Sequence, residues 1–321
     1  MHRPSWFIDG QVVVSNAQTC GINKDGEELY IVDPRTGEHT GEFDDQLGSD
    51  VRRVLEGAPS STVQWVALEE IERTRIVVPT YYDTRANQWF DAYMEIAWPD
   101  FTTATLGELQ ARQELTILRG HGSPAAHLRT GNVPYIKVSD LRAGQVNINP
   151  TNRISEDLAR QYWKDTDSGL RPFDLITPAR TSKNIGDMAV LMPGQERIVC
   201  TKEVLILRPG VAASFNSFYL LWAMSLKIVR DQWQRIVFMQ TNREDTGDRY
   251  LEIRIPVPPT SKRAGEVSRA FSNYYQGIAK IRKEFLKYLG EDKDHHIFLA
   301  SSAADEVSVD VALDDDENDP L

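Results

Sequence analysis

The feature that most constrains this chain is an apolar seam near its C-terminus. Hydrophobic side chains recur there at spacings of three and four residues: Ala264, Val267, Phe271, Tyr274, Ile278, Ile281, Phe285 and Tyr288. This repeat is typical of an amphipathic helix that packs against another helix, as in a coiled coil. Because an isolated amphipathic helix gains little stability in water, we expect the seam to need a partner helix. The predicted subunit interface consists of Val267, Phe271, Tyr274, Ile278, Ile281 and Phe285.

Charge is distributed unevenly along the 321 residues. The whole chain has a net formal charge of −11, and residues 1–110 by themselves carry −11. Residues 111–260 and 261–290 carry +5 each, whereas residues 291–321 carry −10. Phosphate contacts need only a local basic face, so this balance is compatible with binding to nucleic acid through the middle of the chain.

These changes in composition predict an α+β protein with four segments. We expect a small acidic N-terminal domain at 1–100, a β-rich domain at 101–260, a coiled-coil-type helix at 261–290 and an acidic, disordered tail at 291–321. Within the β-rich domain, 133–138 and 204–209 have the composition of strands, and Ser155 is a candidate N-cap for a helix at 156–163. The apolar run from Phe218 to Met239 predicts one long amphipathic helix.

The residue patterns of several enzyme classes are missing. The chain has no GxxxxGK[ST] phosphate loop, no GxSxG nucleophile elbow and no HExxH zinc helix. It also lacks a glycine-rich turn for S-adenosylmethionine and an Asn-Pro-Pro-Tyr or Asp-Pro-Pro-Tyr motif, since the loop at 120–122 (GHG) is too short to hold a cofactor. We therefore expect no catalytic residues, no metal site and no cofactor on this chain. With no apolar run of membrane-spanning length and two well-separated cysteines, Cys20 and Cys200, we expect a cytoplasmic protein with free thiols.

Six short motifs follow one another in the second half of the chain. They are 106–109 (LGEL), 131–141 (GNVPYIKVSDL), 154–156 (ISE), 170–176 (LRPFDLI), 185–190 (IGDMAV) and 253–259 (IRIPVPP). In this order, residues 101–292 resemble one target-recognition domain of a type I restriction-modification specificity subunit, together with the helix that follows it. Phe173 departs from the family's pattern, in which glycine is usual at that position. Because such subunits have two recognition domains and two long helices, the chain resembles a half-subunit.

The N-terminal part carries a second resemblance, which covers about 40 residues. Residues 20–26 (CGINKDG) follow a β-rich run and precede an acidic stretch. This arrangement is similar to the last strands of an N6-adenine DNA methyltransferase. An unrelated small β-hairpin explains the same residues equally well.

The resemblance implies that the domain reads base edges in the major groove of DNA. Arg and Lys can bridge guanine O6 and N7, Asn and Gln can bridge adenine N6 and N7, and further Lys, Arg and Ser side chains can hold phosphates. Two polar loops, at 180–184 and 240–249, supply such side chains. The predicted DNA-binding residues are Lys137, Arg142, Arg180, Ser182, Lys183, Gln240, Asn242, Arg243 and Arg249.

The function that the resemblance implies is sequence-specific DNA recognition on behalf of a separate N6-adenine methyltransferase. S-adenosylmethionine would then belong to that partner, and a restriction or phage-defence nuclease would be an optional further member of the complex. The partners of this chain would be double-stranded DNA, the methyltransferase subunit and, through the heptad helix, a second copy of itself. Two alternatives remain open from the sequence: a scaffold that acts through the heptad helix without binding DNA, and an enzyme with an unrecognised active site.

Overall fold

The computed structural model describes residues 10–148, 151–180, 184–238 and 246–290, and the chain divides into two compact units. Unit 1 contains the chain up to Glu95 together with Gln234–Phe238, and unit 2 contains Ile96–Trp233 and the chain from Met239 onward. The acidic tail predicted at 291–321 lies outside the described residues. Among the described helices, none combines the length and apolar composition that a membrane span requires.

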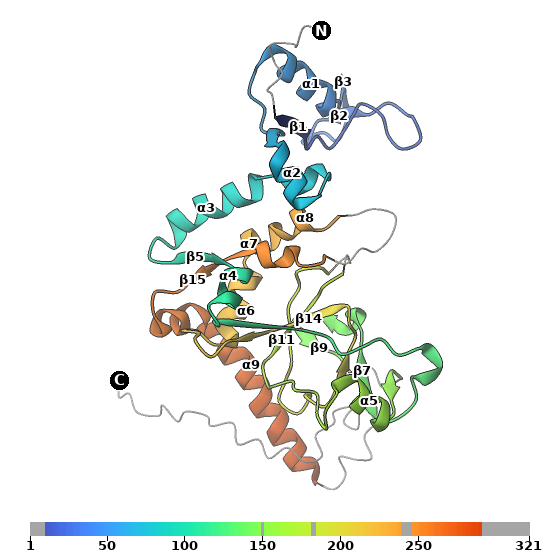
Figure 1. Ribbon diagram of the computed structural model, residues 1–321, viewed down its shortest axis with the longest axis vertical. Helices are drawn as coiled ribbons and strands as arrows, with labels where there is room; N and C mark the ends of the chain where they lie inside the picture. The colour runs from blue at the N-terminus through green and yellow to red at the C-terminus, as the bar shows by residue number, and fades with distance from the viewer. Residues whose placement is uncertain (1–9, 149–150, 181–183, 239–245, 291–321) are drawn as a thin grey trace. The chain divides into compact units, whose positions relative to one another are not determined.

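Unit 1 is built on two small antiparallel sheets (Figure 1). Strand β1 (Gln11–Ser15) pairs with β4 (Val63–Ala67), and β2 (Tyr30–Val32) pairs with β3 (His39–Phe43). The helices of this part are α1 (Gln46–Glu56), α2 (Leu68–Thr74), the 3-10 helix η1 (Pro79–Tyr82) and α3 (Arg85–Ala97). The core of unit 1 comprises Val14, Val66, Tyr81, Tyr82 and Phe238.

Helix α1 is tied to the β1–β4 sheet by a buried carboxylate. Asp50 accepts hydrogen bonds from the hydroxyls of Ser15, Ser60 and Thr62, at 2.6, 2.8 and 2.6 Å. Burial tends to raise the pKa of Asp50, but these three donors outweigh it together with nearby Arg53, and the pKa lies below its ordinary value.

Unit 2 is organised around a mixed six-stranded sheet. Its strand order is β6 (Leu115–Arg119), β14 (Val204–Pro209), β11 (Leu175–Pro178), β12 (Ala189–Val190), β9 (Gln145–Val146) and β8 (Leu141–Arg142). A three-stranded sheet has the order β10 (Arg153–Ile154), β7 (Val133–Ile136) and β13 (Val199–Cys200). The larger core cluster includes Ile136, Leu141, Ile176, Leu191 and Ile206. Helix α5 (Glu156–Trp163) supplies Ala159 and Trp163 to a second cluster, and the Ser155 side chain caps it by accepting from Leu158 N, as the sequence predicted.

The first and last strands of unit 2 pair with each other. Strand β5 (Thr102–Thr105) runs antiparallel to β15 (Arg254–Val257), so the start of this unit lies beside the strand that precedes α9. Thr105 and Glu108 form a reciprocal capping box at the start of α4 (Leu106–Ala111). The first and last of the six sequence motifs thus meet in one local structure.

The long helix predicted at 218–239 was wrong. The structure has three shorter helices there: α6 (Ser217–Ser225), α7 (Lys227–Asp231) and α8 (Trp233–Ile236). Leu226 adopts an extended conformation between the first two, with φ −61° and ψ 130°. Every residue from Phe218 to Met224 is buried, so α6 is apolar on all sides rather than amphipathic.

The heptad repeat lies on helix α9 (Ser261–Leu289), which belongs to unit 2 and contacts α6 (Figure 1). The Thr260 side chain caps its start by accepting from Arg263 N at 3.1 Å. Ala264, Ser268 and Tyr275 are the buried residues of this helix, so part of it packs on its own unit.

Candidate nucleic-acid interface

Several connections of the six-stranded sheet of unit 2 reach one end of it. Strand β6 ends there at Arg119, β11 ends at Pro178, and the antiparallel β14 begins at Val204. The strand directions also bring the tip of the β8–β9 hairpin to this end, because β9 runs parallel to β12 and β12 runs antiparallel to β11. We call this region, comprising residues 119, 142–145, 179–180, 184–188, 202–204 and 246–249, the loop end of the sheet.

The two polar loops that the sequence singled out are anchored to each other at the loop end. Thr246 donates to the carbonyl oxygen of Ala179 twice, from its backbone N at 3.1 Å and from Oγ1 at 2.9 Å. Ala179 precedes the first loop and Thr246 lies within the second. The described ends of these loops are therefore adjacent, although 67 positions separate the two residues in sequence.

The other end of the first loop is joined to the β8–β9 hairpin and the turn before it. The Asn184 side-chain amide donates to the carbonyl oxygens of Val138 and Leu141, at 3.4 and 3.2 Å. These oxygens belong to the segment between Lys137 and Arg142, both of which are predicted DNA-binding residues. The described ends of the first loop are therefore held by the second loop on one side and by the segment that carries Lys137 and Arg142 on the other.

Lys137 and Arg142 flank a short 3-10 helix, η3 (Val138–Asp140). Asp140 is buried and its carboxylate accepts from Lys137 N at 2.8 Å, which fixes the turn. Burial raises the pKa of Asp140 above its ordinary value, although hydrogen bonding and the charge of Lys137 act in the opposite direction. Arg142 is exposed and its Nε donates to Ser139 O at 2.8 Å.

Other arginines at the loop end face carboxylates. Arg180 pairs with Glu203, Arg230 lies 2.7 Å from Asp187, and Arg119 lies 3.6 Å from Asp248. All three pairs are at least partly exposed, so each contributes little to stability and can be exchanged for a phosphate contact at low cost. Arg142 differs, because its described hydrogen bond goes to a carbonyl oxygen.

Two basic residues of this region were missed by the sequence reasoning. Arg119 donates to Gly247 O at 3.0 Å and stacks over the Tyr250 ring at 5.8 Å. Lys202 is exposed two residues before β14. In the sequence, Arg119 is a cation at the end of an apolar run and Lys202 is a cation just before one. Their position at the same end of the sheet follows only from the strand order, which the sequence does not show.

The predicted DNA-binding residues are thus placed in part. The structure describes four of them: Lys137, Arg142, Arg180 and Arg249. The hydrogen bonds of Thr246 and Asn184 link the segments that carry these residues. Arg249 is the first residue of the 3-10 helix η4 (Arg249–Glu252). Five predicted residues lie outside the described residues: Ser182, Lys183, Gln240, Asn242 and Arg243.

The glycines of the 120–122 loop are explained by close packing. A Cβ on Gly120 would lie 1.8 Å from Thr201 O, and one on Gly122 would lie 2.1 Å from the Tyr162 ring. Between them, His121 Nδ1 accepts from Cys200 N at 3.1 Å and Nε2 is bonded to Ser168 O at 2.9 Å. Burial raises the pKa of the neighbouring Cys200 thiol to about 12. No cluster of metal-binding side chains occurs within the described ranges.

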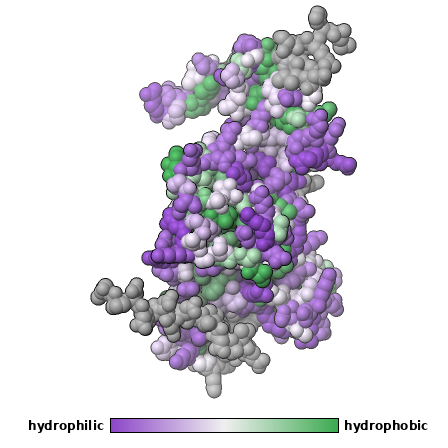
Figure 2. All heavy atoms as spheres, turned by 60° about the vertical axis from the view of Figure 1, so that its left-hand side comes forward, coloured by the Kyte–Doolittle hydropathy of each residue, from purple (hydrophilic) through white to green (hydrophobic). Residues whose placement is uncertain are grey.

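Helix α9 has a second face, which its own unit leaves exposed. Tyr274, Ile281, Phe285 and Tyr288 have 56%, 68%, 43% and 87% of their surface accessible. The other predicted interface residues, Val267, Phe271 and Ile278, are half-buried. The heptad seam therefore begins against unit 2 and continues as an exposed apolar stripe. Figure 2 shows one face of the molecule, on which hydrophobic side chains are scattered among hydrophilic ones.

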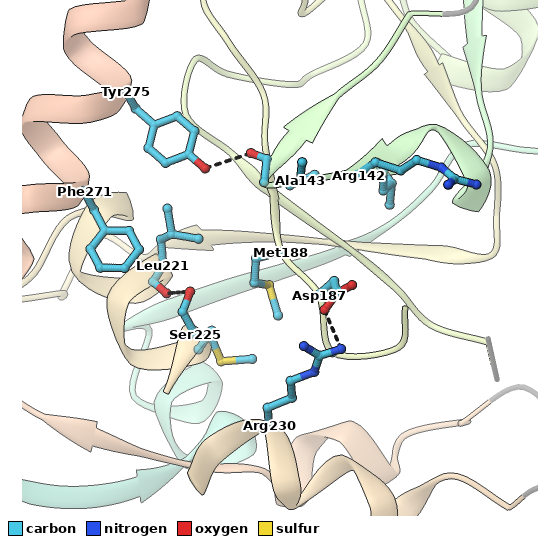
Figure 3. Close-up of a pocket in the computed structure, with 14 residues that line it drawn as sticks. Arg142, Ala143, Asp187, Met188, Leu221, Ser225, Arg230, Phe271 and Tyr275 are labelled. Atoms are coloured by element: carbon cyan, nitrogen blue, oxygen red, sulfur yellow. Dashed lines mark hydrogen bonds and ion pairs between the residues drawn. The ribbon is translucent and has the colours of Figure 1, made fainter. Parts of the chain in front are cut away.

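A pocket of about 310 Å³ lies between α9 and the β8–β9 hairpin (Figure 3). Phe271 and Tyr275 line it from α9, Leu221 from α6, and Arg230 from α7. The Arg142 side chain extends away from the pocket, whereas Arg230 points across it toward Asp187 (Figure 3).

Comparison with known proteins gives structural similarities only. No protein-family model matches the chain, and no curated protein matches it. It is similar to the HsdS subunit from Thermoanaerobacter tengcongensis, with 17% identity, a TM-score of 0.36, and coverage of 76% of this chain and 59% of that one. For the type I restriction-modification S subunit from M. genitalium the values are 12% identity, a TM-score of 0.36, and coverage of 82% and 71%.

A third similar structure is the type IIG restriction endonuclease BpuSI. Its identity is 10%, its TM-score is 0.42, and the match covers 70% of this chain and 33% of that enzyme. A further similar structure, from a study of assembly of the type I R-M system, has 17% identity and a TM-score of 0.38. The chain spans less than two thirds of the length of that protein and of the Thermoanaerobacter subunit. At these identities and TM-scores, the similarities do not assign a function.

Proposed function

We propose that the chain is a sequence-specific DNA-recognition subunit, which directs a separate N6-adenine DNA methyltransferase to its target. The observation that carries the proposal is the anchoring of both polar loops at the loop end of the sheet. Thr246 holds the second loop to Ala179, and Asn184 holds the first to the hairpin that carries Arg142. A rigid sheet that presents several polar loops at one end is a suitable scaffold for groove contacts.

Base reading requires side chains that are held in place but not committed to the protein itself. Arg142 fits this role, because it is exposed at the tip of a hairpin and can offer its terminal nitrogens to guanine O6 and N7. Asn242 and Arg243 of the second loop are proposed to read bases in the same way, with Lys183 holding a phosphate. Arg119, Arg180 and Lys202 add positive charge at the same end and are proposed as phosphate contacts.

The exposed stripe of α9 is proposed to bind a partner helix. Four large apolar side chains on one helix are costly to leave in water, and a partner helix would bury them. A helix of the methyltransferase and a second copy of α9 are both suitable occupants. S-adenosylmethionine, and any associated nuclease activity, would be contributed by partner proteins.

DNA binding by the full chain tests this proposal. We expect the chain to bind duplex DNA with an affinity that falls steeply as salt rises, since phosphate contacts release counterions. Arg142→Ala and Lys202→Ala should weaken binding, and loss of each phosphate contact should reduce the salt slope by about one unit.

Arg112 offers a matched control for these substitutions. It is an exposed arginine that precedes the opposite end of β6, where Leu115 pairs with Pro209. Arg112→Ala should leave DNA affinity unchanged. Equal losses for Arg112→Ala and Arg142→Ala would indicate general electrostatics rather than a defined face, and no DNA binding at all would favour the scaffold alternative.

A further inference from the structure

The carbonyl oxygen of Gly144, at the tip of the β8–β9 hairpin, accepts hydrogen bonds from two different elements. One donor is the backbone N of Val190 on β12, at 3.0 Å. The other is the hydroxyl of Tyr275 on α9, at 2.9 Å. Tyr275 is only 6% exposed, so this bond is made largely out of contact with water.

The hairpin has little capacity to hold its own shape. Its two strands are two residues long each, and such a hairpin is marginally stable without outside support. Ala143 and Gly144, its central residues, have φ of +52° and +75°, the signs that a type I′ turn requires. Alanine is poorly suited to positive φ, so contacts from other elements must hold the turn in this conformation.

The strands of the hairpin pack into the core of unit 2 through Leu141 and Val146, but the turn between them borders a pocket. This pocket, of about 310 Å³, has Ala143 and Gly144 on one wall and Leu221 of α6 on another. Figure 3 shows the Tyr275 hydroxyl reaching the hairpin across the edge of this space. On this side, the Tyr275–Gly144 hydrogen bond is therefore the main described constraint on the turn.

We propose that Tyr275 is a positioning residue for DNA reading, which holds the hairpin tip and thereby sets the direction of Arg142. This inference rests on the proposed function, because it assigns Arg142 a contact with DNA. It makes helix α9 part of the recognition geometry as well as a surface for a partner. Gly144 is required for the same arrangement, since a Cβ there would lie 2.4 Å from the Tyr275 hydroxyl oxygen.

Tyr275→Phe in the full chain tests the inference, because it removes the hydroxyl and keeps the ring. The probe is a duplex recovered by the wild-type chain from a pool with a randomised centre, compared with a scrambled version. We expect the preference for the recovered duplex to fall about fivefold, the equivalent of one ordinary hydrogen bond. Amide hydrogen exchange at Gln145 and Val146, measured without DNA, should accelerate by a similar factor.

An exposed tyrosine outside the proposed DNA and partner surfaces is a matched control. Tyr93 on α3 is 40% exposed, so Tyr93→Phe should change neither the preference nor the exchange rates. The Gly144→Ala substitution gives an independent check. In the wild-type background its methyl group meets the Tyr275 hydroxyl, whereas in the Y275F background the nearest remaining atom of that ring is 3.7 Å away. Gly144→Ala should therefore reduce the preference more in the wild-type background than in the Y275F background.

The outcomes separate this inference from the proposed function. If the wild-type chain prefers its recovered duplex and Y275F leaves either the preference or the exchange rates unchanged, the inference is wrong and the proposed function stands. If the wild-type chain shows no preference for any duplex, the inference and the proposed function are both wrong, whatever the exchange rates are. Loss of preference with faster exchange, absent from Y93F, supports the inference.

Discussion

At the scale of single residues, Phe173 occupies a position at which the resemblance led us to expect glycine. Its backbone lies in the left-handed region, with φ of +64°. The neighbouring backbone is fixed on both sides, because Phe173 N donates to Leu191 O and the buried carboxylate of Asp174 accepts from Arg208 Nε at 2.7 Å. The ring packs on Phe218 with the centroids 5.0 Å apart. The aromatic contact offsets part of the cost of a left-handed conformation.

Two substitutions separate these contributions. Phe173→Ala and Phe173→Gly both lose the contact with Phe218, but only alanine retains the strain of positive φ. We therefore expect the glycine variant to be more stable by about 1 kcal/mol, the reverse of the order at ordinary positions. Urea unfolding of the two variants measures the difference. A more stable alanine variant would show that the backbone at 173 is not held in the left-handed region.

His121 makes stability depend on pH. Burial is the larger influence on its pKa and lowers it below the ordinary value of 6.5, although the bond to Ser168 acts in the opposite direction. The folded state therefore favours the neutral ring. Below about pH 6.5 the unfolded chain binds this proton more readily than the folded one, so stability is complete above that pH and is lost as the pH falls toward the folded pKa.

The comparison with His121→Gln isolates this effect from the carboxylates that titrate nearby. The difference in unfolding free energy between wild type and variant should shrink as the pH is lowered from about 7.5 to about 5.5. A constant difference between wild type and His121→Gln would contradict the half-buried, neutral state of His121.

At the scale of elements, the sequence predicted local structure best where one pattern dominated. The apolar run at 204–209 became β14, and Ser155 caps α5. The run from Phe218 failed because burial on all sides removes the periodicity that distinguishes an amphipathic helix. Leu226 gives no local signal for the break between α6 and α7, since leucine is a good helix former.

The seam of α9 combines two packing partners in one repeat. Ala264 of the repeat is buried against unit 2, while Tyr274 and Ile281 of the same repeat face outward. A period of 3.5 residues shows that a helix has an apolar side, but it does not show which part of that side its own domain covers.

Ile281→Asp tests the partner face directly. Because Ile281 is 68% exposed, we expect the unfolding free energy of the isolated chain to change by no more than about 0.5 kcal/mol. Assembly should be lost, since a charge buried in a helix–helix interface costs several kcal/mol. Light scattering reports self-association, and pull-down reports binding to the methyltransferase.

Gln276→Asp introduces the same charge at another exposed position of α9, outside the seam, and should leave assembly intact. If Ile281→Asp assembles as well as the wild type, the partner surface lies elsewhere.

At the scale of the whole molecule, the sequence located basic segments but could not bring them together. The +5 charge of residues 111–260 is spread over 150 positions, and nothing local indicates that Ala179 and Thr246 meet. That contact, and the one between Asn184 and Leu141, depends on strand order in a sheet whose neighbours are distant in sequence. For the same reason Arg119 and Lys202 were not predicted, although Lys202 lies just before the strand expected at 204–209.

The measurement that most directly tests DNA reading is selection by the full-length chain from a duplex pool with a randomised centre. We expect repeated selection to enrich one short motif. Wild-type affinity for that motif should exceed affinity for a scrambled duplex by at least about a thousandfold at physiological salt. Arg142→Ala should relax the preference at one position of the motif. Binding that stays equal across all sequences, with no motif enriched, would show that the chain does not read DNA sequence.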